Sequence, residues 1–144
     1  AHLLIRRLSF VCGYGSSSLT ERIYCSTNES TEMAGILIYT AAGDADGSLG
    51  GLVEQGKPGN LEEVLNGAIR EALWCTSDPL CSESLGQGTD TLNLAACHSC
   101  CLLPETCCEE GNRLLDRVTV VGRPEDRSIG YWGDYIDHQK MNID

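Results

Sequence analysis

The sequence predicts an α+β domain with a small, mainly antiparallel sheet, helices packed on one face of it, and a separate cysteine-rich lobe. Three observations predict this class. Apolar residues recur at helical spacing over residues 2–12 and again over 60–74. Two short runs, 18–25 and 35–40, have the alternation or the β-branched composition of strands. Residues 75–108 hold seven of the nine cysteines, among polar side chains.

The first helix and the hairpin follow from the amino-terminal pattern. Residues 2–12 present one apolar side, and Gly13 is a natural helix end. Residues 18–25 alternate apolar and polar, which predicts a strand, and 35–40 are apolar enough to predict a buried strand. Because the segment between them is polar and turn-like, the two strands are expected to pair as a hairpin.

The clearest element is a helix that begins near Asn60, after a Gly/Asp-rich loop and a short element around 49–53. Asn60 is a candidate N-cap, and Glu63 stands at the reciprocal position of a capping box. One continuous apolar stripe is formed by Leu61, Val64, Leu65, Ala68, Ile69, Ala72 and Leu73. This amphipathic helix delivers Trp74 and Cys75 at its end.

Beyond the cysteines, residues 109–117 are predicted to be helical, with Leu114 and Leu115 inward, and 118–121 to form a strand. The polar segment from Gly122 onward contains three aromatic residues that are candidate anchors, Tyr131, Trp132 and Tyr135. The predicted organisation is one domain over 1–133, with the cysteine lobe at 75–108 and a polar tail at 134–144.

Length and charge exclude several classes of protein. With 144 residues the chain can bury a core without disulfides. The formal net charge of −11 argues against a module that grips a phosphate backbone by itself, so nucleic-acid contact is expected to be local or supplied by another chain. No apolar run approaches the roughly 20 residues of a membrane helix, and no secretory signal is visible. We therefore expect a reducing, cytoplasmic setting, and a fragment of a longer polypeptide because the chain lacks an initiator Met and begins inside a helix.

The cysteine spacing predicts a metal site. Cys75 and Cys81 are separated by five residues, and Cys97 and Cys100 by two, with fifteen residues between the pairs. Two sulfur pairs joined by a loop are typical of a zinc ribbon or knuckle, because each pair reaches the same tetrahedral ion. Four thiolates leave no position for water, so the zinc is expected to be structural. Such an ion contributes roughly 10 kcal/mol or more to folding, which exceeds what a loop so poor in apolar residues gains by burial.

Other cysteines leave alternatives open. Cys108 is the reserve ligand, and His98 is a substitute for one sulfur, whereas Cys101 and Cys107 are interpreted as bystanders. Buried free thiols or disulfides are the competing interpretation of the whole cluster.

Two further features have both a functional and a structural interpretation. The loop 43–51 carries Asp44 and Asp46, which suit a metal-dependent hydrolase but equally suit a turn that caps the next helix. Arg6 and Arg7 form the only adjacent basic pair. They could contact a phosphate group or an acidic partner, but the simpler interpretation is that they lie on a solvated helix face.

Seven motifs, taken in order, resemble the MrfA-like zinc-binding domain in the form found in the carboxyl-terminal region of DrmB of the bacterial DISARM anti-phage system. They lie at residues 1–8, 35–40, 46–52, 75–81, 93–100, 103–106 and 112–117. The resemblance implies a helicase-associated module, found in bacteria or archaea, whose superfamily 2 helicase partner or domain acts on foreign or damaged DNA.

The resemblance also implies that the zinc ligands are Cys75, Cys81, Cys97 and Cys100, and it carries over no catalytic residue. Any ATPase activity would then belong to a partner or to another domain. The doubled cysteines at 100–101 and 107–108 depart from the family's pattern, so Cys108 competes as the fourth ligand.

The leading hypothesis is thus a structural zinc module, not an enzyme, that scaffolds a helicase in DNA processing or anti-phage defence and reaches DNA through that complex. The rivals are a metal-dependent hydrolase that uses the Asp-rich loop, and a small acidic interaction or DNA-mimic protein.

Overall fold

A computed structural model of the chain describes residues 1–40 and 51–139. Its elements follow in the order α1 (His2–Cys12), β1 (Leu19–Ser26), β2 (Met33–Thr40), α2 (Gly51–Gln55), α3 (Asn60–Ala72), the 3₁₀ turns η1 (Thr89–Thr91) and η2 (Glu105–Cys107), α4 (Val118–Val121), η3 (Arg127–Ile129) and α5 (Gly133–Gln139). Among the described residues, no helix combines the length and apolar character needed to cross a bilayer.

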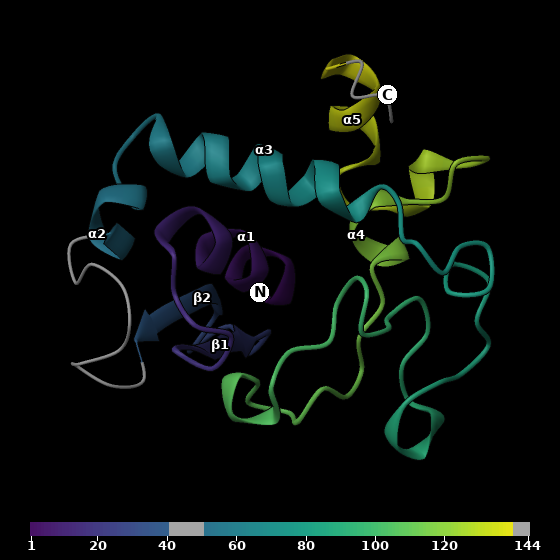
Figure 1. Ribbon diagram of the computed structural model, residues 1–144, viewed down its shortest axis with the longest axis horizontal. Coiled ribbons are helices and arrows are strands. Elements are labelled where there is room, and N and C mark those ends of the chain that lie inside the picture. Colours follow the sequence, from purple (N-terminus) through teal and green to yellow (C-terminus); the bar gives the residue numbers. More distant parts are fainter. Residues whose placement is uncertain (41–50, 140–144) are drawn as a thin grey trace.

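Helix α1 lies between the β-hairpin and α3, so the amino-terminal half of the chain is layered (Figure 1). Ile5 of α1, Leu19 of β1 and Val64 of α3 are buried together in the first hydrophobic cluster. The helix ends where the sequence predicts. Gly13 has a φ of 71°, in the left-handed region that glycine adopts without a Cβ clash, and this terminates α1.

Strands β1 and β2 form the predicted antiparallel hairpin, with Leu19 opposite Thr40 and Ser26 opposite Met33. The expectation that residues 35–40 are buried is wrong, because β2 is exposed along most of its length. The sheet in the described part of the chain has two strands, and its burial is concentrated at the Leu19 end, beneath α1. Strand β2 therefore exposes apolar side chains at the surface of the domain.

Helix α3 confirms the predicted amphipathic element, with a different cap. Gly59 is the N-cap, and its N–H donates to the Glu62 carboxylate at 2.6 Å, so one half of a capping box forms, one residue earlier than predicted. Asn60 instead donates its side-chain amide to the carbonyl oxygen of Glu54 in α2. The buried part of the stripe consists of Val64, Ala68, Ile69, Ala72 and Leu73.

A second hydrophobic cluster joins α3 to the carboxyl-terminal elements. Val121 of α4 and Ile136 of α5 are buried against α3. Two expected anchors, Trp132 and Tyr135, pack on this cluster, whereas Tyr131 is exposed. The segment expected as a polar tail therefore begins in a helix that belongs to the core.

Two expectations for residues 109–121 are wrong. The predicted helix over 109–117 is irregular, because Asn112 and Leu114 each have a φ of 61°, which no α-helix accepts. Leu114, expected to face inward, is exposed. Val118–Val121, predicted as a strand, forms the single helical turn α4, and the Asp116 carboxylate accepts the Val118 N–H at 3.0 Å at its start.

Candidate metal centre

The first cysteine loop begins where α3 ends. The Asp78 carboxylate organises it by accepting the N–H of Cys75 at 2.9 Å and the N–H of Ser82 at 3.1 Å. The Cys81 N–H donates to the carbonyl oxygen of Ser77. These bonds fold residues 75–82 into a tight loop, so the helix end and one carboxylate set the positions of both sulfurs.

Cys97 and Cys100, the second pair of cysteines, lie on a turn that is closed by one carbonyl group. The N–H groups of Cys100, Cys101 and Leu102 all point at the carbonyl oxygen of Cys97, at 2.9–3.1 Å. The Cys97 N–H in turn donates to the Cys100 sulfur at 3.2 Å, and the Ser77 N–H donates to the Cys75 sulfur at 3.4 Å. Backbone donors aimed at sulfur favour thiolates, the form that binds metal.

The four sulfur atoms converge on one point. Sγ of Cys75 lies 3.5 Å from Sγ of Cys97, which lies 3.8 Å from Sγ of Cys100, and Cys81 and Cys100 are 3.7 Å apart. All four lie within 4.8 Å of one another. A tetrahedral Zn²⁺ with bonds of about 2.3 Å places its sulfurs about 3.8 Å apart. The donor set and its spacing therefore fit zinc.

Disulfides do not explain the cluster, since all nine cysteines are free thiols. The four thiols differ in acidity. A hydrogen bond from Cys101 lowers the pKa of Cys100 to about 4, whereas burial raises the pKa of Cys75 and of Cys81. The cluster therefore holds a Cys100 thiolate beside protonated thiols, and a bound cation favours the thiolate form of all four sulfurs.

Arg6 and Arg7 lie on a partly exposed face of α1, and both have partners within the chain. Arg6 donates to the carbonyl oxygens of His98 at 3.4 Å and Ser99 at 3.0 Å, within the second cysteine turn. Arg7 pairs with Glu71 of α3 at 2.7 Å. Helix α1 thus ties the metal lobe to the body of the domain.

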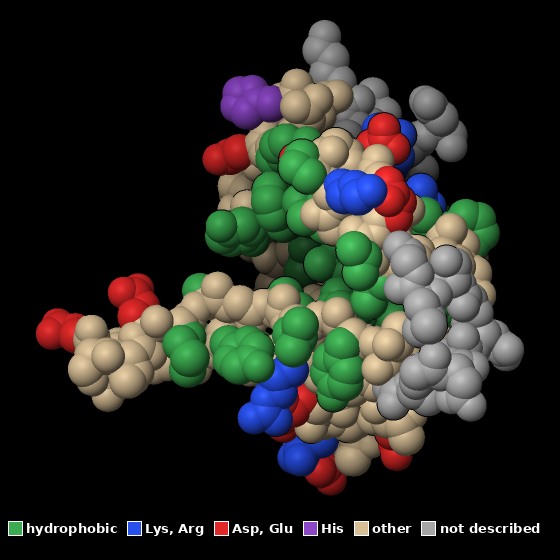
Figure 2. Space-filling model, turned by 90° about the vertical axis from the view of Figure 1, so that its left-hand side faces the viewer, with side chains coloured by type: hydrophobic (Ala, Val, Ile, Leu, Met, Phe, Trp, Pro, Cys, Tyr) green, Lys and Arg blue, Asp and Glu red, His purple; other side chains and the backbone are tan. Residues whose placement is uncertain are grey.

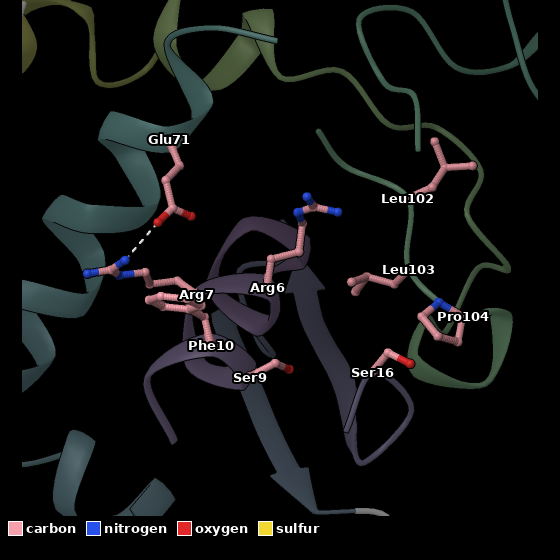
Figure 3. Close-up of a pocket in the computed structure, with 9 residues that line it drawn as sticks. All are labelled: Arg6, Arg7, Ser9, Phe10, Ser16, Glu71, Leu102, Leu103 and Pro104. Carbon is pink, nitrogen blue, oxygen red and sulfur yellow. Dashed lines mark hydrogen bonds and ion pairs between the residues drawn. The ribbon is translucent and has the colours of Figure 1, made fainter. Parts of the chain in front are cut away.

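An open pocket lies between these arginines and the lobe. Figure 3 shows the Arg7–Glu71 pair on one side and the segment 102–104 on the other, with Arg6 between them. The pocket adjoins the metal lobe but contains none of its four sulfurs.

The other predicted site residues lie elsewhere. Cys108 is not in the four-cysteine group but in a second group of buried side chains, and His98 belongs to neither. Cys101 packs with the four cysteines as a hydrophobic neighbour, and Cys107 donates to the Ser16 carbonyl at 3.3 Å. Asp44 and Asp46 lie outside the described residues.

Sequence reasoning missed Asp78 and Arg117, which support the centre. Arg117 is 2% exposed and forms an ion pair with Asp78. The sequence could have indicated the role of Asp78, because an Asp three residues after Cys75 is well placed to accept a backbone N–H in a turn. No local pattern indicates Arg117.

Comparison with known proteins agrees with this geometry. The sequence model of the MrfA Zn-binding domain family matches residues 1–101, a range that contains all four converging cysteines. The chain belongs to the MrfA zinc-binding domain family. The DISARM protein DrmB of Bacillus paralicheniformis is 47% identical over 121 residues, which are 84% of this chain and 21% of that protein. The chain thus spans about a fifth of its relative's length.

Membership of this family identifies zinc as the metal that the domain binds. The domain is a zinc-binding domain, and its four-cysteine cluster is able to bind the ion. It is related to a protein of the DISARM system.

Proposed function

We propose that Cys75, Cys81, Cys97 and Cys100 hold one structural Zn²⁺ and that the domain is a scaffold in a helicase-associated protein. The observation that carries the first part is the convergence of four sulfurs within 4.8 Å. Four protein ligands leave no coordination position for water or substrate. The ion holds the lobe together and performs no chemistry.

Zinc suits this lobe because the lobe has little apolar burial to hold it. The cluster around the site consists mainly of cysteines, with Ala96 as its one other buried member. Apolar burial is correspondingly small, whereas a structural zinc contributes about 10 kcal/mol or more. Thiolate ligands also require reducing conditions, so we place the protein in the cytoplasm.

The β-hairpin supports a scaffolding role. Figure 2 shows it as an arm that projects from the body, with a row of hydrophobic side chains along it and acidic ones near its end. Ile36 is 50% exposed and Leu37 46% exposed, on opposite faces of β2. Apolar residues gathered on a projecting ribbon mark a protein interaction site. With a net charge of −11, this surface suits a protein partner better than DNA itself.

We further propose that the partner is a superfamily 2 helicase, or a helicase domain, that acts in DNA processing or anti-phage defence. The relationship to a DISARM protein supports the setting. DNA is then reached through the complex.

Co-purification tests this proposal. The wild-type chain should retain the helicase, and Leu37→Ser combined with Ile36→Ser should release it, while zinc content and thermal unfolding stay unchanged. Leu85→Ser, at an exposed position in the metal lobe, is the matched control and should keep the partner. Retention of the helicase by the hairpin variant would contradict the proposed surface, and competition with DNA for a DNA-binding protein would favour an acidic mimic instead.

A further inference from the structure

A second group of metal-ligand side chains lies where three distant segments meet. It consists of His2 in the first turn of α1, Glu21 on β1 and Cys108 just after η2, and each offers one ligand atom within 4.8 Å of the other two. All three are more than nine-tenths buried, with exposures of 6%, 3% and 9%. Buried ionisable groups of this kind need partners, because their desolvation is costly.

The hydrogen bond to one ring nitrogen defines the state of the other. Nδ1 of His2 lies 2.8 Å from the carbonyl oxygen of Cys101. A carbonyl oxygen only accepts, so Nδ1 carries a proton and donates it, and in the neutral ring Nε2 is a lone-pair acceptor. Nε2 is buried, has no hydrogen-bond partner, and lies 3.4 Å from Oε1 of Glu21.

One oxygen of the Glu21 carboxylate has the same deficit. Oε2 of Glu21 is buried without a hydrogen-bond partner. A second proton on His2 would turn the pair into a long ion pair but would leave Oε2 unsatisfied. His2 and Glu21 therefore each carry a buried acceptor without a partner, and their side chains approach to 3.4 Å beside the Cys108 thiol, so one cation between them stabilises both.

We propose that His2, Glu21 and Cys108 form a second metal site, which binds Zn²⁺ through Nε2, a carboxylate oxygen and the thiolate. Bonds of about 2.0–2.1 Å to nitrogen and oxygen place two tetrahedral ligands about 3.3 Å apart, close to the observed 3.4 Å. One carboxylate and one thiolate balance the charge of the ion. The Cys101 carbonyl orients the imidazole, as outer partners of metal-bound histidines do.

This site differs from the four-cysteine centre in having three protein ligands. The three residues line a cavity of about 240 Å³, together with Glu110, Arg113 and Asp116. The cavity leaves room for water as the fourth ligand. The two sites are adjacent in structure, because Cys101, whose carbonyl holds His2, follows Cys100 directly. The second ion would join α1, the hairpin and the carboxyl-terminal side of the lobe.

Metal content of the full chain tests the proposal independently of the scaffolding role. Elemental analysis after loading with Zn²⁺ alone, followed by gel filtration, should find about two zinc ions per wild-type chain. His2→Gln and Cys108→Ser should each reduce this to about one, and Cys97→Ser should remove the other. Cys107→Ser, which changes the neighbouring buried thiol, is the matched control and should keep both ions.

Cobalt distinguishes the sites from each other. With Co²⁺ in place of zinc, sulfur-to-metal charge-transfer absorption should be strong in His2→Gln, which retains four thiolates, and weak in Cys97→Ser, which retains the single-thiolate site. If Cys108→Ser fails to fold by circular dichroism, His2→Gln and Glu21→Gln provide the same stoichiometric test. One zinc per wild-type chain, unchanged in His2→Gln, would overturn the second site even if the four-cysteine site is confirmed.

Discussion

Arg117 donates a buried hydrogen bond of 2.9 Å to the carbonyl oxygen of Ala72, the last residue of α3. Its other terminal nitrogen pairs with Asp78, the carboxylate that receives the N–H of Cys75. One side chain therefore connects the end of the central helix to the loop that presents the first two sulfurs. The helix terminus and the metal lobe are therefore linked through a buried charge pair.

Arg117→Met should destabilise the domain. Removing one partner of a buried ion pair typically costs about 3–5 kcal/mol, because the other charge stays buried and unpaired. Asp78 is partly accessible, so we expect about 3 kcal/mol, measured by urea unfolding of the zinc-loaded protein. Arg113→Met is the control, because its 3.7 Å pair with Asp90 is exposed and should matter by less than about 1 kcal/mol. Equal effects of the two substitutions would refute this role.

Cys97→Ser should remove the ion from the four-cysteine centre. Loss of one thiolate opens the tetrahedron, and the lobe then lacks the contribution that holds it. We expect the free energy of unfolding to fall by at least about 3 kcal/mol, with faster proteolysis between residues 75 and 108. Cys25→Ser, at an exposed position on β1, should change stability by less than about 0.5 kcal/mol. Retention of that zinc by Cys97→Ser would exclude Cys97 as a ligand.

Zinc binding should release protons. Burial raises the pKa of Cys75 and of Cys81 above the ordinary value, so both hold a proton at neutral pH in the metal-free protein. Zinc binds thiolates, so its binding expels at least these two protons. The zinc-bound state therefore binds fewer protons, and the stability that zinc contributes is present at higher pH and lost as pH falls. Calorimetry in buffers of different ionisation enthalpy measures the number of protons released per zinc ion bound. A number near zero at neutral pH would contradict the prediction.

Ile136→Ala should show that α5 belongs to the fold. Ile136 is 2% exposed and packs with Ile69 and Val121. Truncating a buried isoleucine typically costs about 2–5 kcal/mol, to be measured by thermal or urea unfolding. Ile129→Ala makes the same chemical change at a half-exposed position and should cost less than about 1 kcal/mol. If Ile136→Ala lowers the free energy of unfolding by less than Ile129→Ala does, α5 does not contribute to the core.

Elements with a strong local pattern were predictable. The spacing of apolar residues identifies α1 and α3, because the helical period places those residues on one face whatever the rest of the chain does. The two cysteine pairs were predictable for a related reason. Within each pair the spacing is so short that any compact turn brings the sulfurs close together, and a shared ion is the simplest way to satisfy two such pairs.

Residues 109–121 were not predictable in the same way. Their path is held by side-chain amides from elsewhere: Asn93 accepts the Leu115 N–H at 2.9 Å and donates to the Asn112 carbonyl at 2.8 Å. Asn112 in turn bonds both the N–H and the carbonyl of Leu103. The two Asn93 bonds satisfy backbone groups of Leu115 and Asn112 that a helix would otherwise pair internally, and the Asn112 bonds fix this path against Leu103, so a helical pattern in the sequence did not become a helix.

The sequence by itself determined the two long helices, the hairpin pairing and the four cysteines of the metal lobe, because each depends on periodicity or spacing over a short stretch of chain. Only the tertiary structure decided that β2 is exposed, that Arg117 closes the first cysteine loop, and that Cys108 lies with His2 and Glu21. The physical reason is that burial and the pairing of polar groups depend on residues far apart along the chain. Their positions relative to one another are set by packing and not by any local pattern.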